Sequence, residues 1–131
     1  MSGSGMRAVD TNVLVRLITR DDATQARAAE SFIAGGAWVS LLEVAEIAWV
    51  LATVYGLSAR DVAQAIEMLL RHESLVLQDA ETIEEALRLY RTTPGLGFSD
   101  CLMLHLAKRA GHVPLGTFDR KLGRVAGALK L

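Results

Sequence analysis

The sequence is poor in cysteine, proline and aromatic residues. Of its 131 residues, one is Cys, two are Pro and 5% are Phe, Trp or Tyr. The single cysteine, Cys101, excludes an internal disulfide framework and argues against a thiolate zinc site, which needs several ligands at defined spacing. The three histidines include no pair four residues apart, so a zincin-like helix is excluded as well.

Long uncharged apolar runs are also absent. No stretch of about 18 such residues occurs, and the N-terminus lacks the basic and then apolar pattern of a signal peptide, so we expect a cytoplasmic protein without membrane contact. Hydrophobic residues nevertheless make up 51% of the chain, which is enough for a single core. We expect one domain over residues 6–131, preceded at 1–5 by MSGSG, which resembles a cloning scar.

Positive charge is distributed unevenly along the chain. No Lys or Arg occurs between residues 28 and 59, whereas residues 108–131 hold six of them against one acid. This last part carries a net charge near +5 and the rest carries about −6, although the whole chain sums to −1. A basic edge attracts polyanions, but a solvated surface has the same charge pattern, so both interpretations stay open.

Short apolar runs alternate with longer segments of helical periodicity. The four clearest runs are at 7–10, 37–40, 75–78 and 113–118. A further short strand is possible near 128–131. Between the runs, apolar residues recur at helical spacing, as at Val62, Ile66 and Leu69. This alternation predicts an α/β fold, with a short parallel β-sheet flanked by helices in three layers.

Two predicted helices carry acids in an apolar context. The helix at 41–55 is apolar on nearly all sides, which predicts burial of most of its surface, yet it contains Glu43 and Glu46. The helix at 99–109 has Asp100 in its first turn, with Ser99 as the expected N-cap. Both helices therefore hold carboxylates that need a partner.

Four acids interrupt apolar segments without a cation nearby in the sequence, namely Asp10, Glu46, Asp100 and Asp119. Asp10 and Asp119 follow predicted strands, and parallel α/β sheets bind ligands beyond the carboxyl ends of their strands. A structural alternative exists for each acid. The three aspartates could stabilise helix N-termini, and Glu46 could reach solvent.

Convergence of these acids would require a cation. Two carboxylates about 4 Å apart repel by about 4 kcal/mol at an effective dielectric near 20, so a metal must be present or some acids must be protonated. Oxygen donors with hydroxyl or amide support from Asn12, Ser99 or Thr117 suit Mg²⁺ or Mn²⁺ rather than zinc. Asp10 would then be a metal ligand.

A carboxylate site of this kind activates water and stabilises the charge that develops during attack on a phosphodiester. Three cations follow Asp119, where a nucleic-acid backbone would approach, namely Arg120, Lys121 and Arg124. The residues therefore favour phosphoryl transfer on a nucleic acid.

Four motifs in order resemble those of PIN-domain ribonucleases, and within that group those of VapC-type toxins from toxin–antitoxin pairs. The motifs are VDTNVLVRL at 9–17, EIAWVL at 46–51, GFSDCLMLHLAKRAG at 97–111 and GTFDRKL at 116–122. The resemblance assigns the family's acids to Asp10, Glu46, Asp100 and Asp119, of which the three aspartates would bind the metal.

The same resemblance implies supporting polar roles for Thr11, Asn12 and Thr117. It also implies Mg²⁺- or Mn²⁺-dependent cleavage of RNA, inhibition by a small VapB-type antitoxin, and homodimerisation. Glu43 departs from the family pattern, so either glutamate of the 41–55 helix could face the metal.

Four other residues have tempting roles for which packing is the better interpretation. Cys101 lacks an identifiable base and is expected to pack as a small hydrophobe. His105 is expected to be partly buried and hydrogen-bonded. Phe98 and Phe118 could stack on bases, but the sequence lacks an interleaved basic and aromatic platform, so both are expected in the core.

Two functional alternatives come from other classes. A receiver-type Mg²⁺-binding signalling module also places acids on a parallel sheet, but its paired acids after the first strand and its late lysine are missing here. A PIN-like fold that binds RNA or a partner without cutting it is the second alternative. The complete set of four acids argues against it, and measured cleavage would separate the two.

Overall fold

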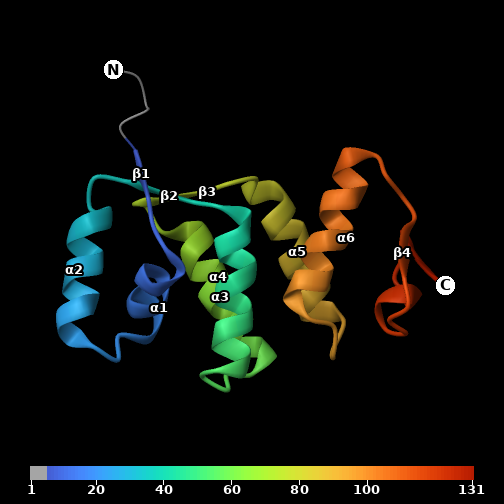
Figure 1. Ribbon diagram of the computed structural model, residues 1–131, viewed down its shortest axis with the longest axis horizontal. Coiled ribbons are helices and arrows are strands. Elements are labelled where there is room, and N and C mark those ends of the chain that lie inside the picture. Colours follow the sequence, from blue (N-terminus) through green and yellow to red (C-terminus); the bar gives the residue numbers. More distant parts are fainter. Residues whose placement is uncertain (1–5) are drawn as a thin grey trace. The chain divides into compact units, whose positions relative to one another are not determined.

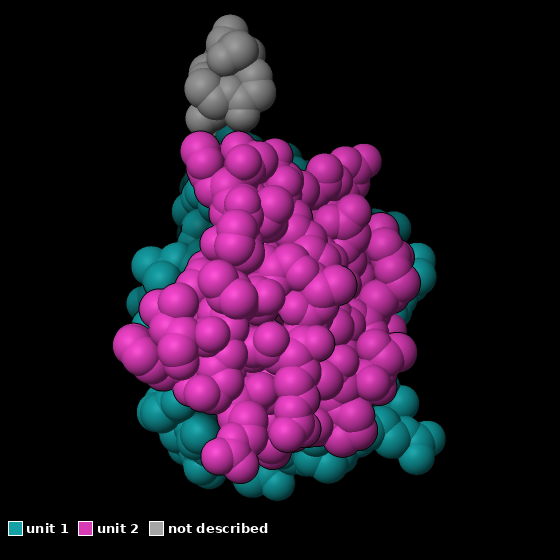
Figure 2. All heavy atoms as spheres, turned by 90° about the vertical axis from the view of Figure 1, so that its right-hand side faces the viewer, with its two compact units in different colours: residues 1–80 teal, residues 81–131 magenta. Residues whose placement is uncertain are grey.

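The computed structural model describes residues 6–131. The predicted cloning scar at 1–5 lies outside the described residues. The chain divides into two compact units, the first running to Ala80 and the second spanning Glu81–Leu131, which Figure 2 shows in different colours. Each unit is described by itself below.

The first unit contains a parallel sheet and four helices within residues 6–80 (Figure 1). Its elements are β1 (Arg7–Ala8), α1 (Thr11–Thr19), α2 (Ala23–Ile33), β2 (Ala37–Val39), α3 (Leu41–Thr53), α4 (Ala59–Arg71) and β3 (Leu75–Leu77). The strand order is β1-β2-β3, with Ala37 opposite both Arg7 and Leu75. The three strands predicted in this region are confirmed.

The core of the first unit forms where helices pack on one another and on the sheet. Helix α1 contacts α2 and α3, and α4 contacts α3 and β3. Helix α4 buries Val62, Ile66 and Leu69 as its periodicity predicts. Ser58 caps this helix by accepting a hydrogen bond from the Asp61 N–H at 3.2 Å.

Helix α3 differs from its prediction. Burial on most sides was expected, but α3 buries a single stripe that includes Val44, Ile47 and Leu51. Leu42 and Trp49 are 74% and 58% exposed. An apolar composition shows that a helix tends towards burial, but the number of neighbouring elements decides how much of its surface is covered. Here α1 and α4 cover one stripe.

The second unit contains two helices, a 3₁₀ helix and a two-stranded parallel sheet. Its elements are α5 (Ala80–Thr92), α6 (Phe98–Ala110), β4 (Leu115–Thr117), η2 (Leu122–Arg124) and β5 (Ala128–Lys130). Strand β5 confirms the short strand expected near 128–131. The fold class is therefore the predicted one, α/β with short parallel sheets flanked by helices.

Helices α5 and α6 run antiparallel, as their contacts show. The rings of Tyr90 and Phe98 meet edge to face with centroids 5.7 Å apart, and at the opposite ends Arg109 donates to Glu81 at 2.7 Å. Gly111 ends α6 with a left-handed φ of 82°, which a glycine adopts without strain. None of the helices within residues 6–131 combines the length and hydrophobicity that a membrane crossing needs.

Candidate active site

Asp10 lies between β1 and α1, at the position predicted for a metal ligand. It is the N-cap of α1, with an extended backbone (φ −87°, ψ 161°), but its side chain makes no capping hydrogen bond. The residue is exposed. Asp10 therefore does not stabilise the helix N-terminus through its side chain, because the carboxylate oxygens accept no hydrogen bond from the helix N–H groups.

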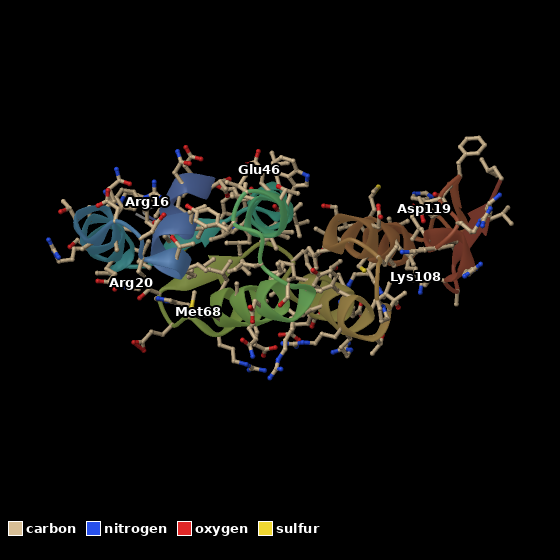
Figure 3. The ribbon with its side chains drawn as sticks, turned by 90° about the horizontal axis from the view of Figure 1, so that it is seen from below. Arg16, Arg20, Glu46, Met68, Lys108 and Asp119 are labelled. Atoms are coloured by element: carbon tan, nitrogen blue, oxygen red, sulfur yellow. The ribbon has the colours of Figure 1, made fainter. Side chains whose placement is uncertain are left out.

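Glu46 is tied to the start of α1 by a hydrogen bond. The hydroxyl of Thr11, which is 8% exposed, donates to Glu46 Oε1 at 2.5 Å. Thr11 directly follows Asp10, so this bond connects the α3 glutamate to the neighbour of the first aspartate. Figure 3 shows Glu46 on α3. A short hydroxyl–carboxylate bond fixes the carboxylate and leaves Oε2 for other partners.

Glu43 has a different task on the same helix. Its Oε1 accepts hydrogen bonds from the backbone N–H of Ser40 at 2.8 Å and from the Ser40 hydroxyl at 2.9 Å. In return Ser40 Oγ accepts from the Glu43 N–H at 3.2 Å, which completes a capping box at the start of α3. Glu43 therefore stabilises the helix, and Glu46 is the glutamate bonded to the residue next to Asp10.

Asp100 lies in the first turn of α6, and the expected N-cap role of Ser99 is wrong. The N-cap is Gly97, and the helix already begins at Phe98. Phe98 is buried against Tyr90 and is the first residue of the helix. Ser99 is therefore an exposed residue within the first turn. Ser99 can still offer a hydroxyl beside Asp100, but not through a cap.

The carboxyl of Asp100 is electrostatically disfavoured in its charged form. Burial raises the pKa of Asp100 above its ordinary value, and the nearby charge of Asp119 raises it further. The two acids therefore interact within the second unit. Among the residues described in this unit, the ion pairs join Arg109 and His105 to Glu81 and Glu85, and neither Asp100 nor Asp119 has one.

Asp119 is exposed and follows β4, and one of its carboxylate oxygens is hydrogen-bonded to the backbone. Its Oδ1 accepts a hydrogen bond from the Leu122 N–H at 2.8 Å, which supports the turn into η2. The Asp119 N–H in turn donates to Thr117 Oγ1 at 3.0 Å. The structural alternative for Asp119 is thus partly realised, because Oδ1 caps the turn while Oδ2 makes no hydrogen bond within the described residues.

The donor set of the four acids fits a hard divalent cation. The carboxylates of Asp10 and Asp100 do not cap their helices. All four acids offer oxygen donors, which Mg²⁺ and Mn²⁺ prefer. Among residues 6–131, no three or more Asp, Glu, His or Cys side chains gather into a group able to hold a metal ion. The metal site therefore stays a prediction.

The three predicted backbone-binding cations follow Asp119 closely and are exposed, namely Arg120, Lys121 and Arg124. Lys121 lies over the turn that precedes α6, since a Cβ added at Gly95 would meet its Nζ. Gly95 also has a φ of 88°, so a side chain there would be strained. The basic segment and the turn before Asp100 are therefore close together in this unit.

Cys101 is buried and His105 is partly buried, as expected, but the hydrogen bond expected of His105 is not found among the described residues. Cys101 is fully buried, and burial together with the charge of Asp100 raises the pKa of its thiol to about 12, so it is not a nucleophile. His105 is half-buried with Nδ1 3.6 Å from Glu85 Oε1, and burial and nearby cations lower its pKa.

One of the two phenylalanines departs from its prediction. Phe98 is in the core as expected, but Phe118 is 80% exposed. Phe118 lies in the turn between β4 and Asp119, where the chain leaves the sheet, so the alternation that buries strand residues no longer applies.

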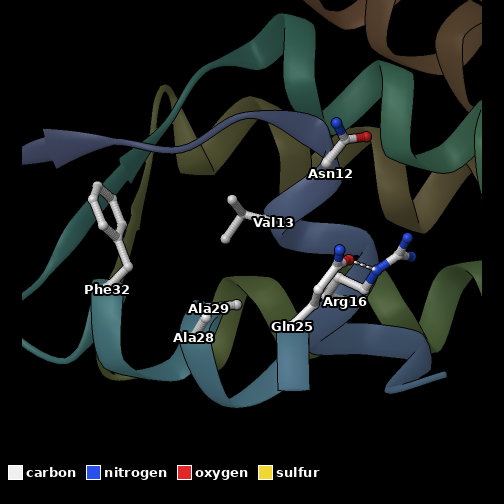
Figure 4. A pocket seen from close by; sticks show the side chains of 7 residues that line it. All are labelled: Asn12, Val13, Arg16, Gln25, Ala28, Ala29 and Phe32. Carbon is white, nitrogen blue, oxygen red and sulfur yellow. Dashed lines mark hydrogen bonds between the residues drawn. The ribbon is translucent and has the colours of Figure 1, made fainter. Parts of the chain in front are cut away.

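A pocket that no sequence pattern predicts lies beside Asn12, the supporting residue proposed from the DTN motif. Asn12 is exposed in the first turn of α1 and lines this pocket together with Arg16 and Gln25 (Figure 4). Only the packing of α1 on α2 brings these residues together, because their spacing along the chain does not match one helix face. Among the described residues, no hydrogen bond ties Asn12 to Asp10.

The comparison with known families identifies the family of the chain. The family model described as PIN domain matches residues 7–128, a range that includes all four acids. No curated protein and no solved structure matches the chain. PIN domains are generally nucleases and typically bind divalent metals. On the strength of this match, the chain belongs to the PIN domain family and has a nuclease-type fold.

Proposed function

We propose that the protein is a Mg²⁺- or Mn²⁺-dependent endoribonuclease that uses Asp10, Glu46, Asp100 and Asp119. The observation that carries the proposal is the state of Asp100, which is half-buried beside Asp119 without a cation partner in the described part of its unit. Such an arrangement costs free energy in the metal-free protein. A bound divalent cation would turn that cost into attraction.

The chain's own residues would divide the work as follows. The aspartates Asp10, Asp100 and Asp119 would hold the metal, which supplies Lewis-acid stabilisation of the charge on the phosphodiester. Glu46, whose Oε1 is held by Thr11, has Oε2 free to accept a proton from the attacking water. The water oxygen then forms the new bond to phosphorus, and the bond from phosphorus to the leaving oxygen breaks.

The RNA backbone would run along the basic segment after Asp119. If Arg120 and Lys121 each neutralise one phosphate of a single strand, replacing both by Ala lowers the slope of log affinity against log salt by about 1.4. Filter binding of a single-stranded RNA over a range of salt concentrations measures this slope. An unchanged slope would remove the segment from the model.

The biological role we propose is that of a VapC-type toxin held by a small antitoxin, with the chain as a homodimer. The order of the four motifs across residues 9–122 supports the toxin role. The exposed apolar side chains of Leu42 and Trp49 on α3 support a covered surface in an assembly. The family match leaves the receiver-type alternative without support.

Cleavage of a total-RNA pool by the purified protein tests the activity. We expect cleavage with Mg²⁺ or Mn²⁺, none with EDTA, and none with Asp100→Asn. Glu84→Gln is a matched control because Glu84 is an exposed acid of the same unit and removes the same charge. Wild-type cleavage by Asp100→Asn, or cleavage that persists in EDTA, would contradict the proposal.

A further inference from the structure

The pocket between α1 and α2 combines an apolar floor with a size suited to a small planar group. Its volume is about 500 Å³, within the range of small-molecule sites. Val13 contributes from α1, and Ala28, Ala29 and Phe32 contribute from α2. Figure 4 shows these small side chains and the one aromatic ring around the pocket.

Polar groups at the other side of the pocket are held in fixed positions. Arg16 Nε donates to Gln25 Oε1, and Figure 4 draws this bond along the rim. A second guanidinium nitrogen of Arg16 lies 3.3 Å from Asp21 Oδ1 and 3.5 Å from the Tyr55 hydroxyl. The guanidinium is therefore oriented before any ligand arrives, which lowers the entropy cost of binding. The Gln25 amide N–H groups and Asn12 add further polar contacts.

The pocket begins two residues along the chain from the candidate metal ligand Asp10, which does not itself line it. Asn12 is two residues from Asp10 and Arg16 is six, so at a rise of 1.5 Å per residue they lie roughly 3 and 9 Å further along α1. Successive nucleotides of a stacked strand are about 3.4 Å apart. A nucleotide within one to three positions of a phosphodiester held at Asp10 is thus within reach of the pocket.

We infer that this pocket binds an unpaired purine base of the RNA next to the cleaved bond, an inference that rests on the proposed ribonuclease function. Proteins read single-stranded RNA by stacking splayed bases on aromatic side chains and by hydrogen bonding to their edges. The Arg7 guanidinium already stacks on one face of the Phe32 ring, 3.9 Å from the ring centroid, so the other ring face and the alanines are left to match the faces of a base. Arginine, asparagine and glutamine side chains pair with the O6, N7 and N6 positions of purines.

The surroundings favour a base over an apolar segment of a protein partner. Three of the side chains that line the pocket are polar, and Arg16 places a guanidinium at its edge. A purely apolar side chain would offer no hydrogen bond to the Gln25 amide N–H groups or to Asn12, and burying these groups unpaired costs free energy. A base offers flat faces to the apolar floor of the pocket and hydrogen-bonding edges to its polar side chains.

Filling the pocket tests the inference without relying on cleavage. Ala28 is exposed, so Ala28→Phe occupies the pocket from its mouth, and Ala23→Phe is the matched control because Ala23 is exposed on α2 outside the pocket. Both are made in the Asp100→Asn background and titrated with the four nucleoside 5′-monophosphates, with binding followed through methyl NMR shifts of Val13 and Ala29. We expect GMP or AMP to bind more tightly than CMP or UMP. Ala28→Phe should weaken the purine by about tenfold while Ala23→Phe does not.

Cleavage of a randomised single-stranded RNA then tests the role in the reaction. We expect wild-type and Ala23→Phe to share a purine preference near the cut, and Ala28→Phe and Gln25→Ala to lose it. If the wild type cuts no RNA, the proposed function fails while the titration still judges the pocket. Unchanged purine binding and preference in Ala28→Phe would overturn the inference. Weakened binding of a co-expressed antitoxin without any change towards RNA would assign the pocket to a protein partner and overturn it too.

Discussion

The two units hold their acids in opposite ways. In the first unit, Glu46 is fixed by a hydrogen bond from Thr11, and the neighbouring Asp10 is exposed. In the second unit, Asp100 is half-buried and destabilised by Asp119, and it makes no ion pair with the described residues of the unit. In the first unit a hydrogen bond holds Glu46, whereas in the second unit Asp100 and Asp119 repel each other.

This difference suggests a division of labour between the two pairs. A hydrogen-bonded glutamate keeps its orientation whether or not a cation is bound, which suits a group that accepts a proton. A repelling pair gains most when a cation arrives, which suits groups that hold the metal. The first unit then contributes mainly orientation, and the second contributes mainly affinity.

Removing one acid from each unit should give the largest effect. Asp10→Asn and Asp100→Asn each remove a charged ligand, and we expect each to lower cleavage by about 10³-fold or more, equivalent to roughly 4 kcal/mol of transition-state stabilisation. Rates with a defined RNA at saturating Mg²⁺ measure the loss. Raising the Mg²⁺ concentration should restore neither variant, and full rescue of one of them would exclude that aspartate from the essential set.

Removing the hydroxyl that orients Glu46 should have a smaller effect. Thr11→Val deletes the hydrogen bond but keeps the shape, and partners that orient ligands are typically worth about 10- to 100-fold in activity or metal affinity. Thr11→Ser should restore most of the rate. Thr117→Val is the counterpart in the second unit, because the Thr117 hydroxyl accepts from the Asp119 backbone. An equal loss in both variants would remove the contrast between the units.

The two glutamates of α3 should separate stability from activity. Ser40→Ala and Glu43→Ala break the capping box, which should cost about 1 kcal/mol of unfolding free energy with little change in cleavage by the folded protein. Glu46→Ala should do the reverse. Urea unfolding and cleavage rates are measured on the same samples. Lost activity in a fully folded Glu43→Ala would show that the capping glutamate also faces the reaction.

Local patterns were sufficient to predict the strands and several of the helices, although not α1 and α2. The five strands lie within the predicted runs, and α4 buries the apolar stripe of its sequence, because period and burial are properties of neighbouring residues. Helix α6 ends at Gly111, close to the predicted end at residue 109, because few residues other than glycine adopt its φ without strain.

Features that depend on packing between elements could not be predicted. Glu43 and Glu46 are equivalent in the sequence, and only the bonds to Ser40 and Thr11 distinguish them. The exposure of Trp49 depends on which helices surround α3, and the pocket beside Asn12 depends on α1 meeting α2. The four acids were identified from their context, whereas the hydrogen bond that holds Glu46 and the repulsion between Asp100 and Asp119 required the structure.

The smallest effect concerns the pH dependence of stability in the absence of metal. The pKa of Asp100 is raised above its ordinary value of 3.8, so the folded state favours the protonated form. The stability contributed by this proton is full below about pH 3.8 and is lost as the pH rises through the raised pKa. Asp100→Asn removes the effect, so in EDTA the stability of this variant relative to the wild type should rise between pH 3.5 and pH 7.

Urea unfolding at both pH values measures this difference, and Mg²⁺ should reverse its sign at pH 7, since the wild type alone gains a complete ligand set. An advantage that shrinks as the pH rises would mean that the second pair is not under electrostatic strain. The contrast between the two units would then lie in hydrogen bonding alone.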